Sequence, residues 1–187
     1  MRNYLIFTIS ILILICGNLG AEDKSLTSQV MSPINKFTGF VRYKKYDKAL
    51  EYLDLETFCD SILKGHDIPA NKKREFIEAV KVYIQKQSFP KVHKYFDKID
   101  VNYEKPVEKP KHVEVPASIL YEGKEKILFS WILVKKNGKY LIADFLSDVI
   151  TEGQHASIYE KYKQVEPILQ TQGIDVVIKR IYKLANQ

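Results

Sequence analysis

Two acidic residues, Asp144 and Asp148, lie in an otherwise apolar stretch that reads NGKYLIADFLSDVITEG over residues 137–153. A carboxyl group among apolar side chains has a raised pKa and can act as a general base. Asp144 is therefore a candidate base for a small enzyme with a cone-shaped α+β fold. The alternative is structural, because a carboxylate at the end of a strand often caps the next helix or pairs with a lysine. The spacing favours the structural interpretation of both residues.

The other reactive side chains form no common catalytic or metal-binding motif. No histidine stands in an HExxH motif, and the spacing indicates surface residues at His66, His93, His112 and His155. Cys59 lies on the apolar face of a predicted helix, where a lone cysteine usually acts as a small buried hydrophobic residue. The sequence also lacks the GxSxG, Walker and GxGxxG motifs. These observations predict no metal, no cofactor and no enzyme activity.

The composition is that of a single folded domain. The chain has 187 residues, of which 45% are hydrophobic and 28% are charged, and this excludes disordered and fibrous classes. The formal net charge is +6, which favours anionic partners such as membrane surfaces. No nucleic-acid-binding motif is present, so nucleic acid is not a predicted partner.

The first 21 residues have the three parts of a secretory signal peptide. Arg2 precedes an apolar stretch, and small residues follow up to Ala21. We therefore predict that residues 1–21 are removed on export and that residues 22–187 form the mature domain.

The sequence leaves two other interpretations of this segment open. Lipidation at Cys16 would anchor the protein, although Ile15 is large for the residue before a lipidated cysteine. A retained membrane helix would need about 20 apolar residues, more than this stretch provides. If the segment is removed, Cys59 remains as a single cysteine, so we expect no intramolecular disulfide.

The first half of the mature domain is predicted to be helical. Asp54 stands where it can cap a short helix, and a longer helix is predicted from Lys72 to Lys86. A further short helix is expected within residues 91–99. The apolar stripe of the first helix comprises Val30, Ile34, Phe37 and Val41.

In the second half, β-branched and aromatic residues predominate and tight turns separate the apolar runs. Asn137-Gly138 is a strong signal for a two-residue hairpin turn, because both residues tolerate positive φ. We predict three or four antiparallel strands, with Pro106, Pro110 and Pro116 at an edge of the sheet. The strand ILFSWILV is apolar on both faces, so something besides helices has to cover one of them.

The chain then returns to helix. A helix is predicted from His155 to a stop at Gly173, with a kink at Pro167, and a last helix carries an apolar stripe from Ile174 to Leu184. The order of helices, hairpin sheet and helices predicts a single α+β domain.

The C-terminal part resembles a known family. The segment NGKYLIADFLSDVITEG, followed by YEKYKQVEPILQTQGIDVVIKRI, is similar to the MlaC or toluene-tolerance family of periplasmic phospholipid-binding proteins. Tyr140 takes the position of a family tryptophan, Asp144 that of a family aspartate, and QTQGID that of a Gly-Ile-Asp segment. Upstream, YLDLETFCDSIL and REFIEAVKVYI resemble two family helices. Either Asp148 or Glu152 matches the acidic position in the turn after the strand.

The resemblance implies a periplasmic shuttle with an apolar cavity and without enzyme activity. Such a protein carries phospholipids between the inner and outer membranes, maintains outer-membrane lipid asymmetry, and acts as a monomer. It exchanges lipid with an inner-membrane ABC-type transport complex and an outer-membrane lipid-transfer complex. Because each buried methylene contributes about 0.8 kcal/mol, two chains of about sixteen carbons represent on the order of 20 kcal/mol of exposure to water.

The apolar strand and the helical stripes supply the candidate walls of such a cavity. An envelope interaction module with a solid core is a further alternative, which the absence of a cavity of several hundred Å³ would favour. The candidate lipid-binding residues are Phe40, Leu55, Phe58, Phe76, Val80, Ile84, Phe129, Trp131, Leu133 and Phe145.

Overall fold

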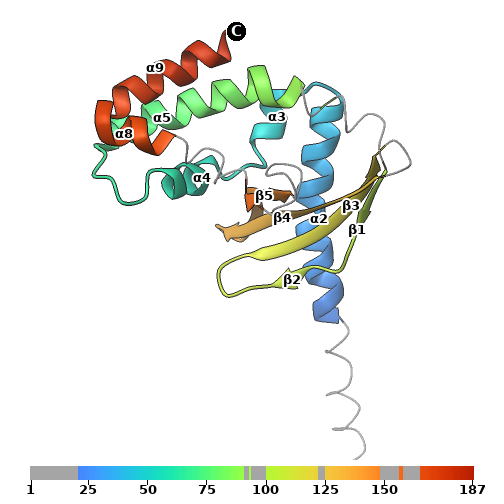
Figure 1. The fold of residues 1–187 in the computed structure, drawn as a ribbon. Coiled ribbons are helices and arrows are strands. Elements are labelled where there is room, and N and C mark those ends of the chain that lie inside the picture. The colour runs from blue at the N-terminus through green and yellow to red at the C-terminus, as the bar shows by residue number, and fades with distance from the viewer. Residues whose placement is uncertain (1–20, 91–92, 94–99, 122–124, 148–155, 158–164) are drawn as a thin grey trace, which may run out of the picture.

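The computed structural model describes residues 21–90, 93, 100–121, 125–147, 156–157 and 165–187 (Figure 1). The helices are α2 (Ala21–Arg42), α3 (Tyr46–Leu50), α4 (Leu55–Ile62), α5 (Ala70–Tyr83), the π-helical turn η1 (Ile84–Ser88), α8 (Glu166–Gln172) and α9 (Ile174–Ala185). The strands are β1 (Val101–Tyr103), β2 (Val107–Glu108), β3 (Val113–Tyr121), β4 (Glu125–Lys136), β5 (Lys139–Ser147) and β6 (Ala156–Ser157). This order confirms the predicted α+β class. Residues 1–20, most of the predicted helix at 91–99, and Asp148 lie outside the described residues.

The strands form one antiparallel sheet in the order β1-β3-β4-β5-β6, and β2 pairs with the other end of β3 from β1. β4 and β5 are joined by the predicted hairpin turn, in which Asn137 has a φ of 51° and Gly138 a φ of 77°. Two successive positive φ angles match the right-handed twist of the strands on either side. The hairpin prediction is confirmed.

The edge position predicted for Pro116 is wrong, because β3 lies inside the sheet. β1 pairs with β3 at residues 117–119 and β2 pairs with it at residues 113–114, so Pro116 stands where one neighbour gives way to the other. Its carbonyl accepts a hydrogen bond from the Glu104 N–H at 2.8 Å. Proline has no N–H to donate, but the ladder is already interrupted at this position, so the lost hydrogen bond costs little free energy.

The first hydrophobic core lies between α2 and one face of the sheet. The predicted stripe of α2 is buried, and it packs with Val115, Trp131 and Leu133 from β3 and β4. Figure 1 shows α2 running across this face of the sheet. Pro33 lies inside α2, which continues past it to Arg42.

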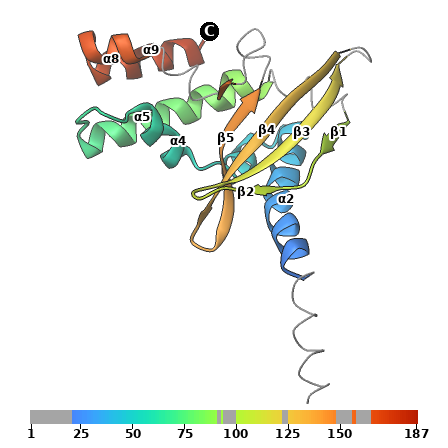
Figure 2. The ribbon, with the colours of Figure 1, turned by 60° about the horizontal axis from the view of Figure 1, so that its bottom comes forward.

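The second core lies in a separate layer of helices. In both ribbon views α5 and α9 run side by side, and α4, α5, α8 and α9 lie together beyond one end of the sheet (Figures 1 and 2). Cys59 is fully buried here, and this burial raises the pKa of its thiol to about 12. The core of this layer comprises Phe58, Cys59, Ile62, Leu63, Phe76, Ala79, Val80, Leu169, Val177, Ile178 and Ile181.

The C-terminal predictions are correct in outline and wrong in three details. β6 occupies residues 156–157 of the predicted helix, and Pro167 lies in the first turn of α8, which begins at Glu166, instead of kinking a longer helix. Proline suits this position because its absent N–H lacks a partner in the first turn of any helix. Leu184 is 49% exposed, and Ala185 is buried in its place. Gly173, with a φ of 79°, ends α8 as predicted.

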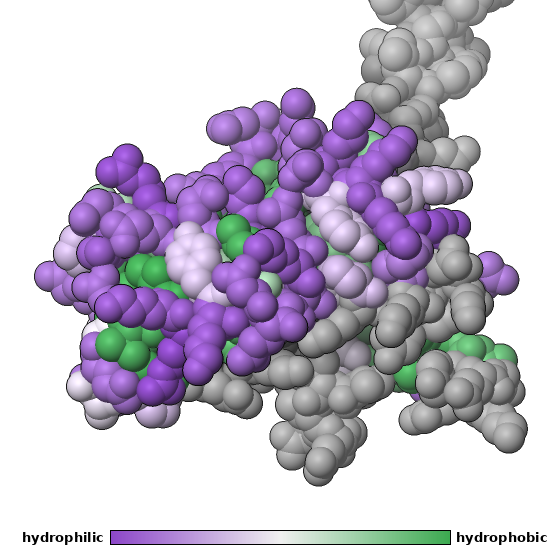
Figure 3. All heavy atoms as spheres, turned by 90° about the horizontal axis from the view of Figure 1, so that it is seen from above, coloured by the Kyte–Doolittle hydropathy of each residue, from purple (hydrophilic) through white to green (hydrophobic). Residues whose placement is uncertain are grey.

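In the part of the chain that the structure describes, no helix is both long enough and apolar enough to span a membrane. The face in Figure 3 is mostly hydrophilic, with small hydrophobic areas between polar side chains.

Candidate functional site

A cavity of about 190 Å³ lies between the two cores. Its walls come from α2, α4 and the segment before it, the η1 turn with Phe89, β4 and β5, and it is partly open to solvent. Nearly all of the lining is apolar, so the cavity favours an apolar ligand over water. Among the described residues it is lined by Phe37, Leu53, Asp54, Leu55, Phe58, Ile84, Ser88, Phe89, Trp131, Ile142, Ala143, Asp144 and Phe145.

Aromatic rings make up much of the wall. Trp131 lies edge-on to Phe145, with ring centroids 5.0 Å apart, and edge-on to Phe37 at 5.7 Å. Phe37 also contacts Phe89 at 5.7 Å. Edge-to-face contacts of this kind hold the rings in fixed positions relative to one another, so the aromatic part of the wall has a defined shape.

The π-helical turn η1 brings the end of α5 to the cavity. The N–H of Phe89 donates to the carbonyl of Ile84, five residues earlier, which widens the helix locally. Ile84, Ser88 and Phe89 all line the cavity as a result. Single π-helical turns inside α-helices are rare and occur frequently at functional sites.

A β-bulge in β5 allows four consecutive residues, 142–145, to line the cavity. Leu133 pairs with Ile142, but Ile132 pairs with Asp144, so Ala143 is the extra residue. In a regular strand, Ile142 and Phe145 would point to opposite faces because side chains alternate. Because of the bulge, both side chains lie on the cavity side, where Ile142 pairs with Leu133 and Phe145 pairs with Trp131.

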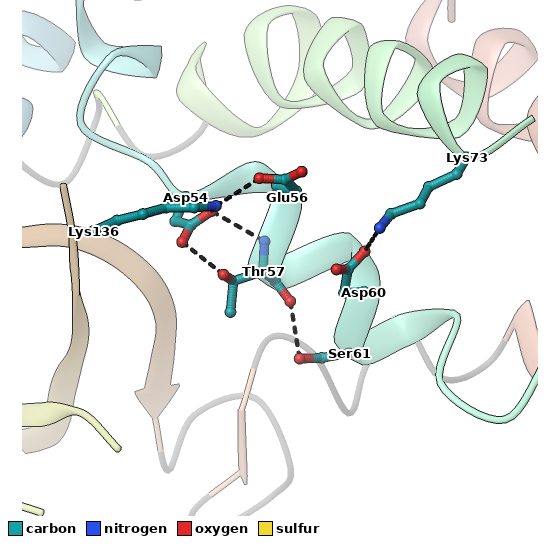
Figure 4. Close-up of polar contacts among 7 residues, drawn as sticks. All are labelled: Asp54, Glu56, Thr57, Asp60, Ser61, Lys73 and Lys136. Atoms are coloured by element: carbon teal, nitrogen blue, oxygen red, sulfur yellow. Dashed lines mark hydrogen bonds and ion pairs between the residues drawn. The ribbon is translucent and has the colours of Figure 1, made fainter. Parts of the chain in front are cut away.

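Asp54 fixes the edge of the cavity where α4 meets the sheet (Figure 4). It is 3% exposed, and its carboxylate accepts hydrogen bonds from the Thr57 N–H at 3.0 Å and the Thr57 hydroxyl at 2.6 Å. The Lys136 ammonium donates to Asp54 at 3.2 Å and to Glu56 at 2.6 Å. Thus the predicted cap is confirmed, and it has a lysine partner that the sequence did not indicate.

Burial by itself would raise the pKa of Asp54. The hydrogen bonds from Thr57 and the Lys136 ammonium outweigh this effect, and together they hold the pKa of Asp54 below its usual value. The backbone adds a second connection, because the Asp54 N–H donates to the Ile142 carbonyl at 2.8 Å. Asp54 therefore joins α4 to β5 as an ionised structural residue.

Asp144 lies in the cavity wall, and its carboxylate accepts a hydrogen bond from the backbone N–H of Phe145 at 2.7 Å. This contact fixes the side chain against its own strand beside the bulge. Elsewhere, the His66 ring lies 2.9 Å from Glu166 and connects the loop before α5 to α8. The residues that the structure describes contain no group of three potential metal ligands.

The ten predicted lipid-binding residues divide into two sets. Leu55, Phe58, Ile84, Trp131 and Phe145 line the cavity. The others lie in the two cores: Phe40, Phe129 and Leu133 pack between α2 and the sheet, and Phe76 and Val80 pack within the helical layer.

Sequence reasoning missed five apolar wall residues: Phe37, Leu53, Phe89, Ile142 and Ala143. Phe37 carried a usable signal, because it belongs to the apolar stripe of α2. For Ala143 the sequence gives no signal, since its position depends on the bulge.

The family model described as MlaC protein matches residues 32–183. The chain belongs to the MlaC family. The resemblance predicted from the C-terminal segment is therefore confirmed over most of the chain. A search of the curated proteins gives no match.

Among solved structures, a phospholipid-binding protein from Ralstonia solanacearum, solved in complex with a phospholipid, has a similar fold. The TM-score is 0.67 at 10% sequence identity, and the match covers 86% of this chain and 96% of that one. Membership of the MlaC family indicates a binding or transport protein, and the Ralstonia structure shows that the fold is shared.

Proposed function

We propose that this member of the MlaC family is a periplasmic phospholipid carrier that moves lipid between the inner and outer membranes. The observation that carries the proposal is the apolar cavity between the two cores, in a chain that matches the MlaC family over residues 32–183. The phospholipid complex of the similarly folded Ralstonia protein supports the same ligand class.

The physical requirement for a carrier is to keep acyl chains out of water during transfer. Each methylene that enters an apolar site gains about 0.8 kcal/mol, so a long chain supplies enough free energy for stable binding without any specific polar contact. A wall of aromatic and aliphatic side chains meets this requirement. The polar head group then stays near solvent, and we expect head-group selectivity to be weak.

Within this proposal, Leu55, Phe58, Ile84, Trp131 and Phe145 contact the acyl chain, together with Phe37 and Phe89. Residues 1–21 act as a signal peptide that is removed on export, and residues 22–187 are the mature, monomeric domain. Lipid is exchanged with an inner-membrane ABC-type complex and with an outer-membrane lipid-transfer complex.

Native mass spectrometry of the exported protein tests the carrier proposal. We expect a mass increment that corresponds to bound lipid, which organic extraction removes and incubation with phospholipid vesicles restores. A protein that carries no lipid from cells and loads none from vesicles would contradict the proposal. Lys126, an exposed residue outside the cavity wall, provides a control: the Lys126→Gln variant should load normally.

A further inference from the structure

A basic surface lies where α2 ends and α3 begins. The two helices pack against each other and are joined by a short turn at residues 43–45 (Figure 1). Residues 36–52, hereafter the α2–α3 surface, contain five basic and two acidic side chains. Their formal net charge of +3 is half of the +6 of the whole chain. The basic side chains are all exposed: Lys36, Arg42, Lys44, Lys45 and Lys48.

Two of these lysines lie over aromatic rings. The Lys36 ammonium is 6.0 Å from the centroid of the Tyr52 ring, and the Lys48 ammonium is 5.9 Å from that of Phe40. The two rings are themselves 5.8 Å apart. An ammonium over a ring face is attracted by the ring quadrupole. The rings therefore favour positions of both cations at the exposed side of the helix pair.

The positive charge of this surface is not neutralised by ion pairs. Within the described ranges of the chain, its four lysines form none, although lysines of α5 and β4 do. Of the two acidic residues, Asp47 accepts a hydrogen bond from the amide of Gln85 at 2.6 Å. The lysines are thus available to an anionic partner.

Tyr43 lies in the middle of the basic turn. It is 73% exposed, more than any other large hydrophobic residue in the part of the chain that the structure describes. Basic residues are favoured in the last turn of any helix, which accounts for Arg42. That effect does not reach Lys36, more than a turn before the helix end, and it does not explain an exposed tyrosine.

We propose that the α2–α3 surface binds an anionic lipid bilayer, with Tyr43 at the level of the head groups and the lysines against lipid phosphates. Tyrosine is enriched at this depth of membranes because its ring is apolar and its hydroxyl polar. Lysine is a point charge on a flexible stem, which suits phosphates that move laterally more than one fixed binding geometry.

This inference goes beyond the proposed carrier function, because it concerns the outside of the protein and not the ligand of the cavity. The two regions are neighbours in the chain. Tyr52 is followed directly by Leu53 and Asp54, which line the cavity. A bilayer bound at the α2–α3 surface would therefore lie near the segment that leads into the cavity wall.

Flotation of the exported protein with vesicles tests the inference. One set of vesicles contains phosphatidylethanolamine and phosphatidylcholine, which have no net charge, and the other also contains phosphatidylglycerol. We expect binding to the anionic vesicles to be tighter by at least about tenfold. It should weaken as the salt concentration rises from about 0.1 to about 1 M, because the screening length falls from about 10 to about 3 Å.

Two variants with the same net charge locate the binding surface. The first replaces the four lysines of the α2–α3 surface with glutamine and should bind anionic vesicles more weakly by about fivefold for each lysine. The control replaces four exposed lysines outside this surface and should lose less than the first variant loses for one lysine. The control substitutions are Lys109→Gln, Lys126→Gln, Lys139→Gln and Lys179→Gln.

Tyr43→Ser tests the aromatic contribution separately. It leaves every charge in place, so it should weaken vesicle binding at both salt concentrations, including the one at which the lysines are screened. Circular dichroism establishes that each variant is folded.

The outcomes are distinct. Equal losses for the two four-lysine variants would overturn the inference, because net charge alone would then explain the binding. Polyglutamate serves as a probe for an acidic protein partner, and tighter binding to it than to anionic vesicles would also overturn the inference. Lipid loading is measured in parallel by native mass spectrometry. Folded protein that carries lipid and binds no vesicles would overturn the surface and leave the carrier function intact.

Discussion

Asp54 makes three structural contacts, two through its buried side chain and one through its backbone. It caps α4 through Thr57, accepts a hydrogen bond from Lys136 of β4, and through its backbone N–H connects α4 to Ile142 of β5. The contacts with Lys136 and Ile142 join the edge of the helical layer to the sheet, next to the cavity. Loss of the carboxylate therefore weakens the junction of the two cores.

Two substitutions of Asp54 distinguish the contribution of the helix cap from that of the contact with Lys136. Asp54→Ala removes both the cap and the lysine contact and should reduce the free energy of unfolding by about 1–3 kcal/mol, whereas Asp54→Asn keeps a cap and should lose less. Urea denaturation measures both. Glu56→Gln is the control, since Glu56 is exposed and solvent screens its ion pair with Lys136. If Asp54→Asn and Glu56→Gln reduce the free energy of unfolding equally, a special structural role for Asp54 is excluded.

The acid dependence follows from the lowered pKa of Asp54. Because its pKa is lower in the folded than in the unfolded state, the ionised side chain stabilises the fold above the ordinary value of 3.8. That contribution is lost as the pH falls below 3.8 and through the folded pKa. The difference in unfolding free energy between wild type and Asp54→Asn should therefore be constant above pH 5 and shrink below it, as measured by urea denaturation at each pH. A difference that grows on acidification would contradict the assignment.

Trp131 provides a direct test of where the ligand lies. The chain contains one tryptophan, and it is in the cavity wall. A lipid with a brominated acyl chain should quench its fluorescence by more than half on loading, because heavy-atom quenching needs contact. A lipid brominated on its head group is the control and should quench weakly. Strong quenching by both would place Trp131 near the polar end of the ligand instead.

At the scale of elements, the junction between α8 and α9 depends on Gly173. Its φ of 79° and ψ of 172° form a combination that residues with a Cβ rarely adopt. Gly173→Ala should therefore destabilise the protein by about 1–3 kcal/mol. Gly39, inside α2 with open space around it, is the matched control, and Gly39→Ala should stabilise by about 0.5–1 kcal/mol because alanine favours helix. Thermal denaturation of the two variants should show shifts of opposite sign.

Local signals predicted several elements well. The cap at Asp54, the turn at Asn137-Gly138 and the helix stop at Gly173 each depend on a few neighbouring residues, and all three are confirmed. These features require only the conformational preferences of the residues themselves.

The partners of the apolar faces were not predictable in the same way. Phe76 and Val80 of α5 were expected to bind lipid, but they pack within the helical layer and do not line the cavity. A stripe shows which face of a helix is covered, and several covering elements satisfy it equally. The position of Ala143 depends on a bulge, which arises from the pairing of β4 with β5 and leaves no mark in either strand alone.

At the scale of the whole molecule, the proposed lipid ligand would join two cores that otherwise meet at a cavity. Phe58 and Ile84 reach it from the helical layer, and Phe37 and Trp131 from the sheet side. A bound acyl chain supplies the missing contacts between them. Lipid should then raise the midpoint of thermal unfolding, with about 2.7 kcal/mol of stabilisation at a free ligand concentration of 100 times Kd. Calorimetry of delipidated and reloaded protein measures this, and an unchanged midpoint would contradict binding to the folded state.

Cys59 and Trp131 lie on opposite sides of the cavity, and each is suited to report on its own side. The thiol of Cys59 is fully buried in the helical layer, so a thiol reagent reaches it only when that layer opens. Trp131 belongs to the packing of the sheet against α2. The rate of thiol labelling at Cys59 would therefore report opening of the helical layer, and the emission of Trp131 would report opening of the sheet core. Both residues occur naturally in the chain, so no probe has to be introduced.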